Sequence, residues 1–220
     1  MDIRLLPSQA IAVVLSLSAQ SAGAAAALDF DQTFNDRGEP ASSHYVATYW
    51  LANGEHRLEV WRDRNLHLKR RTDEAIETHV DRVPGQSEWS MVVLDLKRRI
   101  RTDIDRTNLY RIGHFTDWFS LSHSLSRPAG PYELTVLPPG AQPRITPIGS
   151  CRWYLLTQGP QTNKICWSAA QRAPVVITDG GDAVRWALSA IDNRALAEGS
   201  FVIDDRDFLR NNASEDIAAD

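Results

Sequence analysis

The chain has 220 residues, of which 24% are charged, and a formal net charge of −4 at pH 7. Acidic and basic residues alternate along it, and the basic clusters at 69–71 and 97–101 are each closely followed by acidic residues. The sequence shows no concentrated basic face of the kind that follows phosphates, so we expect no nucleic-acid partner. The length suits one domain with a single hydrophobic core.

Residues 1–27 have the order of a secretory signal peptide: the positive Arg4, an apolar run at 11–19 and small residues at 22–27. The apolar run is shorter than the ~20 residues that span a bilayer. We predict that the signal is cleaved near Ala27 and that the mature protein works in the periplasm, peripheral to the membrane at most. An uncleaved N-terminal anchor is the alternative interpretation.

Residues 28–43 are polar and rich in turn formers, and we interpret them as a leader before the folded domain, with a short helix as the alternative. Beyond them, short segments with β-branched, aromatic and alternating residues predict strands. Asn53-Gly54 is the strongest hairpin signal, because both residues tolerate positive φ. Such short connections predict an antiparallel meander that forms a curved sheet or barrel. The predicted strands lie at 44–52, 56–63, 65–71, 76–83, 88–96 and 98–104.

The alternation stops at 108–125, where apolar residues cover more than half of a helical wheel. A division of this helix into two pieces at Gly113 is the alternative, and Pro128 ends it. A helix this apolar must be covered, most simply by the concave side of the sheet. We therefore predict a mainly β (α+β) fold, in which a curved antiparallel meander forms an unclosed barrel that an apolar helix covers. The apolar positions are Leu109, Ile112, Phe115, Trp118, Phe119, Leu121 and Leu125.

Strands return after a proline- and glycine-rich connection at 138–150, over CRWYLLT, NKICWSA, PVVITD and AVRWALSAID. The sequence then turns acidic, which predicts a last strand and a frayed tail at 211–220. Because no internal repeat or domain boundary is evident, we predict that residues 44–210 form one domain.

The two cysteines, Cys151 and Cys166, lie at nearly equal distances from Gly159. If 151–157 pairs with 163–169, the cysteines face each other within about one residue of register, as a cross-strand disulfide in an exported protein requires. Their spacing excludes a C-x-x-C redox motif, and zinc would need ligands that are not nearby. We predict a structural disulfide, with free or regulatory thiols as the alternative.

Four histidines recur once per predicted strand and raise the question of a metal site. A two-residue turn at Asn53-Gly54 and another turn around 72–75 would place them at different ends, or on opposite faces, of the strand pairs. The sequence contains no His-x-His or Glu-x-x-His spacing. We therefore expect neither a metal nor another cofactor. The four are His44, His56, His67 and His79.

A hydrolytic trio can be imagined within the predicted helix, among Asp117, Ser120, Ser122 and His123. On that helix Asp117 and Ser120 share a face, but His123 lies among apolar positions and Ser122 points away. The chain also has no G-x-S-x-G nucleophile elbow. We predict no catalytic residues and no enzymatic activity.

The remaining signal is aromatic, since the seven tryptophans are spread over nearly every element. Large rings fill cores, and some of these rings can instead line a cavity between a curved sheet and an apolar helix. Our candidates for the cavity and its lid are Trp50, Trp61, Trp89, Leu109, Ile112, Phe115, Trp118 and Phe119.

Several stretches resemble the periplasmic lipoprotein-carrier (LolA/LolB-like) fold superfamily over most of 44–210. They are LHLKRRTDEAIETHVDR, MVVLDLKRRIRTDID, the apolar helix, PIGSCRWYLL and ALAEGSFVID. The cysteine hairpin and DRTNLYRIGHFTDWF depart from the pattern. The resemblance implies an unclosed antiparallel barrel with a helical lid that binds acyl chains or other lipid-like ligands.

The function that we expect is that of a non-enzymatic periplasmic binding or carrier protein. It would hold an apolar or acylated ligand, either a lipid or an acylated protein, between the sheet and the lid helix. The alternative is an interaction or accessory module that assists a periplasmic or envelope protein complex and uses the sheet as a scaffold.

Overall fold

The computed structural model describes residues 27–85, 89–104, 117–138 and 148–212. Two short helices in these segments are α1 (Phe30–Thr33) and α3 (Trp118–His123). The strands are β1 (Ser42–Leu51), β2 (Gly54–Asp63), β3 (His67–Thr72), β4 (Ile76–Arg82), β5 (Trp89–Asp95), β6 (Ile100–Ile104), β7 (Glu133–Val136), β8 (Arg152–Gln158), β9 (Gln161–Ser168), β10 (Ala173–Asp179), β11 (Val184–Asp192) and β12 (Leu209–Asn212).

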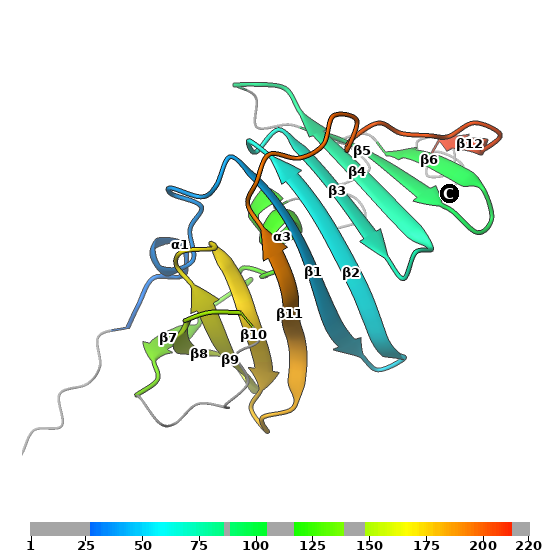
Figure 1. Cartoon of the computed structure of the whole chain (residues 1–220). Coiled ribbons are helices and arrows are strands. Elements are labelled where there is room, and N and C mark those ends of the chain that lie inside the picture. Colours follow the sequence, from blue (N-terminus) through cyan, green and yellow to red (C-terminus); the bar gives the residue numbers. More distant parts are fainter. Residues whose placement is uncertain (1–26, 86–88, 105–116, 139–147, 213–220) are drawn as a thin grey trace, which may run out of the picture.

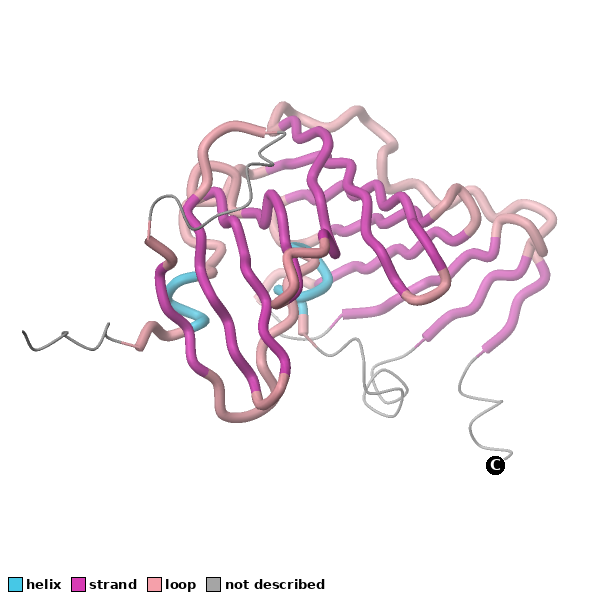
Figure 2. The backbone as a smooth tube through the Cα atoms, turned by 90° about the horizontal axis from the view of Figure 1, so that it is seen from below, coloured by secondary structure: helices cyan, strands magenta, loops and turns pink. Residues whose placement is uncertain are grey.

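All the described strands join one sheet, in the order β12-β6-β5-β4-β3-β2-β1-β11-β10-β9-β8-β7. Neighbours are antiparallel except β12, which runs parallel to β6. The edge strands β7 and β12 lie at opposite ends of the curved sheet and do not pair with each other (Figures 1 and 2). The predicted mainly β, unclosed sheet is therefore confirmed. Strand β7 was not foreseen.

The first hairpin differs in register from the prediction. Leu51 pairs with Gly54, so the connecting residues are Ala52 and Asn53 instead of Asn53-Gly54. Gly54, with φ 128°, is already the first residue of β2. His56 therefore lies opposite Tyr49, not opposite Leu51 as the predicted turn would require.

Helix α3 lies behind the strands in Figure 1, on the concave face of the sheet. Its Trp118 and Leu121 pack into a core of alternate residues from β1–β5 and β11. Phe119 and Leu125 pack into a second cluster with Phe30 and with residues of β7–β9. The helix thus contacts both halves of the concave face.

The helix is much shorter than the predicted 108–125. Residues 108–116, with Leu109, Ile112 and Phe115, lie outside the described residues. In the described part, α3 begins after Asp117, whose carboxylate caps the backbone N–H groups of Phe119 and Ser120. It ends at Ser124, which adopts a left-handed conformation with φ 54°. No helix in the described segments is long and apolar enough to cross a membrane.

Residues 28–43, predicted as a polar leader, contribute to the folded domain. Asp29 caps α1, whose Phe30 is buried, and Phe34 after the helix is buried too. The Phe34 ring makes edge contacts with Tyr154 and Trp167 at centroid distances of 5.2 and 5.3 Å. This segment therefore packs on the concave face beside α3.

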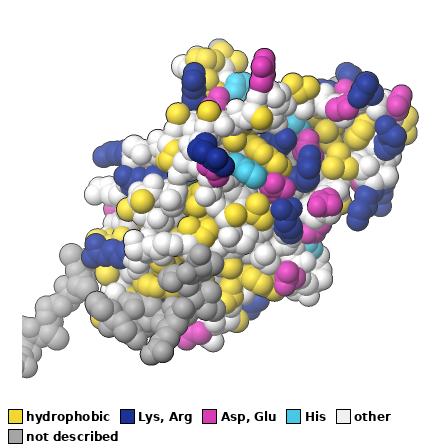
Figure 3. Space-filling view, in the orientation of Figure 1, with side chains coloured by type: hydrophobic (Ala, Val, Ile, Leu, Met, Phe, Trp, Pro, Cys, Tyr) yellow, Lys and Arg dark blue, Asp and Glu magenta, His cyan; other side chains and the backbone are white. Residues whose placement is uncertain are grey.

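The convex face of the sheet carries mixed charges, and Figure 3 shows acidic, basic and histidine side chains interspersed on it. The chain from 193 to 208 crosses the sheet from β11 to β12 (Figure 1). Phe201 of this segment lies 5.5 Å from the ring of His67, and Asp205 accepts a 2.7 Å hydrogen bond from Arg101. These contacts hold the crossing segment against the sheet.

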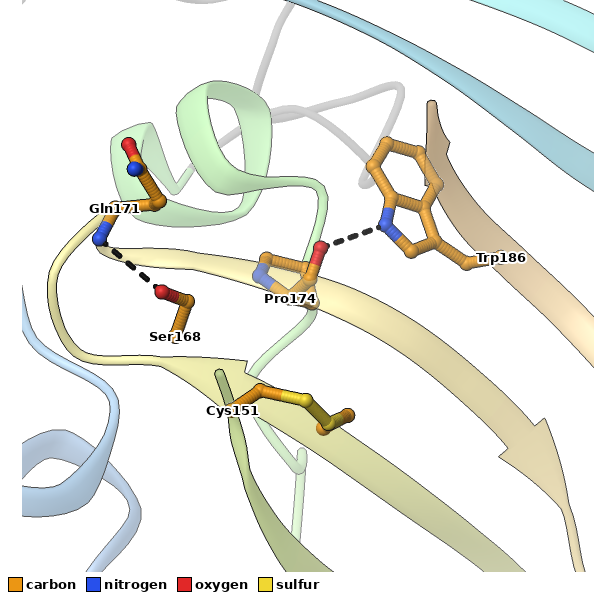
Figure 4. Close-up of a disulfide and its surroundings, with 6 residues drawn as sticks. Cys151, Ser168, Gln171, Pro174 and Trp186 are labelled. Atoms are coloured by element: carbon orange, nitrogen blue, oxygen red, sulfur yellow. Dashed lines mark hydrogen bonds between the residues drawn. A yellow bond between two sulfur atoms is a disulfide. The ribbon is translucent and has the colours of Figure 1, made fainter. Parts of the chain in front are cut away.

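A disulfide joins Cys151 and Cys166, as predicted, with their Cα atoms 5.4 Å apart (Figure 4). The pair is diagonal: Cys166 lies opposite Trp153, two residues beyond Cys151, so the register differs from the expected one. A loop of this length contributes about 3 kcal/mol through the entropy of the unfolded chain. The bond is compatible with an oxidising compartment.

Candidate functional site

A cavity of about 400 Å³ lies between α3 and the concave face of the sheet. One part of its lining is apolar, with side chains of Leu51, Leu58, Leu121, Ile177 and Trp186. Hydroxyl and guanidinium groups supply the rest: Tyr49, Arg70, Ser120, Ser124, Ser126 and Arg185. Its size is within the ~300–1,000 Å³ of small-molecule sites, and so is its mixture of apolar walls and few polar groups.

Arg70 reaches the cavity from the middle of β3. It lies between Val60 of β2 and Thr78 of β4, on the same face as Leu68. One of its terminal nitrogens donates a 3.2 Å hydrogen bond to the carbonyl oxygen of Leu121. Burial lowers the pKa of Arg70, and the phenols of Tyr45 and Tyr49 oppose that shift. Arg70 forms no ion pair with a carboxylate of the described residues.

Tyr45 closes the wall next to Arg70 without supplying a negative charge. Its hydroxyl donates a 3.1 Å hydrogen bond to the carbonyl oxygen of Ser122 and lies 3.3 Å from Ser124 Oγ. Burial raises the pKa of Tyr45, so the phenol stays neutral at physiological pH. The positive charge of Arg70 therefore faces neutral groups.

Arg62 of β2 is fully buried, unlike the half-buried Arg70, and lies in a saturated polar cluster. Its Nη1 is 3.0 Å from Glu39 Oε2 and 2.7 Å from His123 Nε2, which itself is 3.1 Å from Glu39 Oε2. Ser122 Oγ lies 2.7 Å from Nδ1 of the same ring. Burial lowers the pKa of His123. A neutral His123 with its proton on Nδ1 accepts from Arg62 at Nε2 and donates from Nδ1, whereas a hydrogen bond to Glu39 requires a proton on Nε2.

The four residues considered as a hydrolytic trio lie in two separate places. Asp117 and Ser120 meet at the start of α3, where Ser120 Oγ donates a 2.6 Å hydrogen bond to Asp117 and Arg127 pairs with the same carboxylate. Ser122 and His123 lie in the buried cluster and are 0% and 2% exposed. In these positions the residues fix α3 to the sheet.

Each of the four histidines considered for a metal site contacts its own carboxylate. The pairs are His44–Glu59, His56–Asp73, His67–Asp81 and His79–Glu77, at 2.6–2.8 Å. His67 lies opposite Asp81 and His79 opposite Lys69, so these two share a face instead of lying on opposite faces as predicted. Over the described ranges, no three His, Cys, Asp or Glu side chains are grouped to hold a metal ion.

The predicted cavity residues are distributed differently. Trp50 and Trp61 project to the convex face, where Trp61 stacks on His44 at 4.9 Å and has Lys69 Nζ 4.0 Å from its ring. Trp89 and Trp118 contact each other in the core at 6.0 Å, and Phe119 stacks on His123 at 4.3 Å. Trp50, Trp61, Trp89, Trp118 and Phe119 do not line the 400 Å³ cavity.

Sequence reasoning missed Arg70, Tyr49, Leu121 as a cavity residue and Trp186. One signal points to Arg70: it follows Leu66 and Leu68 at the two-residue period of the apolar face. A charged residue at a core position of a strand must be paired, or it must serve a site.

No protein-family model matches this chain, and no curated protein matches it. Among solved structures it is similar to an uncharacterized conserved protein from Thermus thermophilus, with 10% sequence identity and a TM-score of 0.42. That match covers 80% of this chain and 93% of the other. At these values the likeness identifies neither a family nor a function, and the resemblance to lipoprotein carriers stays a prediction.

Proposed function

We propose that this is an exported, non-enzymatic binding or carrier protein that holds an apolar or acylated ligand between the concave face of its sheet and α3. The observation that carries the proposal is the 400 Å³ cavity, whose apolar side chains come from β1, β2, β10, β11 and α3. A preformed concave space with apolar walls and a few polar groups is the usual form of a small-molecule site.

The role of α3 in the proposal is that of a lid element. Leu121 forms part of the cavity wall, whereas Phe119 and His123 anchor the helix away from the cavity. Leu109, Ile112 and Phe115, which the sequence predicts as further lid residues, lie outside the described residues. A ligand that enters the cavity would replace water against Leu58, Ile177 and Trp186, which favours apolar chains.

Two features support export. The N-terminal 27 residues have the composition of a signal peptide, and the Cys151–Cys166 bond suits the oxidising periplasm. A lipid or an acylated protein of the cell envelope is the ligand class that combines this location with an apolar cavity.

The proposal is tested with a neutral probe, so that the result depends on apolar binding alone. Mature protein from the periplasm is titrated with N-phenyl-1-naphthylamine, and a saturable rise in fluorescence at one site per chain is expected. Native mass spectrometry and solvent extraction of the same preparation should show co-purifying lipid.

Ile177→Trp places a large ring in the cavity wall and should weaken probe binding by tenfold or more. Val202→Trp is the matched control, because Val202 is 71% exposed on the crossing segment and should leave binding unchanged. An empty protein without saturable probe binding would overturn the proposal and favour an accessory module of an envelope complex.

A further inference from the structure

We infer that the ligand is a single-chain anionic amphiphile, whose carboxylate or phosphate monoester head group binds Arg70 while its chain lies along the apolar wall of the cavity. The inference rests on the proposed function, because it assumes that the cavity takes an apolar chain. It adds the chemistry of the head group and the residue that recognises it.

The first step is the charge of Arg70. Buried charges in proteins are normally paired, since removing an ion from water is costly without a partner. Arg62, one strand away, follows this rule through Glu39. Arg70 has the Leu121 carbonyl, which is neutral, as its hydrogen-bond acceptor. Within the described residues, no carboxylate therefore compensates the charge of Arg70, which lines the cavity half-buried.

The second step is the geometry of the guanidinium. It has five N–H donors, and the bond to Leu121 uses one of them. A planar fork of this kind matches the paired oxygens of a carboxylate or phosphate better than a single ammonium does. Tyr49 and Ser124 line the same cavity, so their hydroxyls can add donors for the head group.

The third step excludes the other arginine of the cavity. Arg185 also lines the space, but its guanidinium donates 2.6 and 2.9 Å hydrogen bonds to Asp179, and its side chain is 52% exposed. Its charge is thus compensated within the protein and screened by solvent. Arg70 is the stronger anion site, because no carboxylate of the described residues compensates its charge and because it is half-buried, whereas Arg185 is exposed.

The fourth step concerns the chain of the ligand. Leu58 and Trp186 line the cavity together with Arg70, and Leu51 and Ile177 extend the apolar lining. One site therefore combines a cation that no described carboxylate compensates with apolar walls, as a fatty acid or a lysophosphatidic acid requires. A cationic head group would place two like charges together in the same cavity.

The test compares ligands that share a chain and differ in their head group. Dodecanoate, dodecyl phosphate, dodecanol and dodecyltrimethylammonium displace N-phenyl-1-naphthylamine from the wild-type protein at pH 7.5, below their micelle concentrations. Both anions should bind roughly tenfold to a hundredfold more tightly than dodecanol, as expected for a charge-assisted hydrogen bond. The trimethylammonium compound should bind more weakly than dodecanol.

Arg70→Gln should reduce the affinity for both anions to that for dodecanol and leave dodecanol unchanged. Arg71→Gln is the matched control, because it removes the same charge from the adjacent position on the convex face, where Arg71 pairs with Glu77 at 2.6 Å. This variant should keep the preference for anions. Arg70→Lys should recover part of it.

The outcomes separate the two proposals. Equal binding of dodecanol and the anions by the wild-type protein, or an anion preference that survives in Arg70→Gln, would overturn the head-group inference and leave the apolar carrier intact. Failure of all four compounds would overturn the carrier itself. Saturable binding of inorganic phosphate alone, without binding of any chain, would identify a free-anion site and overturn both.

Discussion

Arg62 and Arg70 lie on neighbouring strands of the same concave face, and α3 contacts both, yet their surroundings are opposite. Arg62 is 3% exposed and bonds to Glu39 and His123. Arg70 donates to the carbonyl of Leu121 and faces a cavity of about 400 Å³.

The difference shows how one short helix can serve two purposes. The C-terminal end of α3 contributes His123 to the Arg62 cluster, which ties the helix to β2 and to the segment before β1. Leu121, on another side of the helix, forms the wall of the cavity. The buried charge of Arg62 holds the structure together through its partners, whereas the half-buried charge of Arg70, without a carboxylate partner among the described residues, is available to a ligand.

The largest expected effect comes from breaking the Arg62 cluster. Arg62→Met should lower the free energy of unfolding by about 3–5 kcal/mol, because it leaves the carboxylate of Glu39 buried without its cation. The double variant Arg62→Met/Glu39→Leu should recover most of that loss. Urea denaturation at pH 7.5 measures both. A loss below about 1 kcal/mol in the single variant would show that the cluster is not a structural anchor.

A second comparison concerns two side chains of α3. Phe119→Ala should cost about 3–5 kcal/mol, because the ring is packed between His123, Trp167 and Phe30. Leu121→Ala should cost about 2–3 kcal/mol, at the low end for such changes, because Leu121 already borders open space. The chemical denaturation midpoints of the two variants give the difference. Equal losses would argue that the cavity wall is packed as tightly as the core.

Much of the sheet could be predicted from the sequence, since period-two alternation is a local signal. The strand pairs from 44 to 104 and the disulfide followed from it. The predicted strand registers differ from the observed ones by one or two residues, because Ala52-Asn53 and Gly159-Pro160 form the turns. Local residue preferences do not fix which two residues form a turn. A slip of one residue moves every side chain to the other face, which is why His67 and His79, predicted on opposite faces, share one face.

The site was harder to predict than the fold. His123 lies 61 residues from Arg62 and 84 from Glu39 along the chain, and no local pattern connects them. Because of their size, the tryptophans were predicted to line a cavity. Trp61 lies instead on the convex face with Lys69 and Arg71, and the β2–β3 register determines this placement. Arg70 was visible only as an exception to the apolar alternation that begins with Leu66 and Leu68.

The same substitution at Arg70 should not lower the free energy of unfolding. Arg70→Met removes a half-buried charge that has no carboxylate partner among the described residues, at the loss of one hydrogen bond to Leu121. We expect between no change and a gain of roughly 2 kcal/mol in the free energy of unfolding of the lipid-free protein. Urea denaturation after solvent extraction of lipid is the measurement. A loss greater than about 2 kcal/mol would mean that Arg70 has a structural role in holding α3 in place and is not an anion-binding residue.

Ligand binding can be compared between the wild-type protein and Arg70→Met through its effect on stability. A ligand that binds the folded state alone raises stability by RT ln(1 + [L]/Kd), or ~2.7 kcal/mol at a hundredfold excess over Kd. Dodecanoate at a fixed concentration should therefore raise the Tm of the wild-type protein and have much less effect on Arg70→Met. Dodecanol should stabilise both proteins equally. A dodecanoate shift of the same size in both would remove Arg70 from the site.

The smallest expected effect is on the pH dependence of the stability that the Arg62 cluster contributes through His123. Burial lowers the pKa of His123 in the folded protein below the ~6.5 of an unfolded histidine. Between these two pKa values the unfolded chain binds a proton that the folded chain does not bind. The contribution of His123 to the free energy of unfolding is therefore fully present above about pH 6.5 and is lost as the pH falls from there toward the folded pKa. Its slope cannot exceed ~1.4 kcal/mol per pH unit for one proton.

The measurement is a set of urea midpoints at pH 7.5, 6.5 and 5.5 for the wild-type protein and His123→Gln. This range leaves the carboxylates of both proteins ionised, and the four histidines that pair with carboxylates on the sheet contribute equally to each. The difference between the two proteins should narrow as the pH falls, because the wild-type protein alone loses the His123 contribution. A difference that is constant with pH would show that His123 accepts its proton in the folded cluster, with Glu39 as its counter-ion, and that Arg62 is less tightly compensated than the geometry indicates.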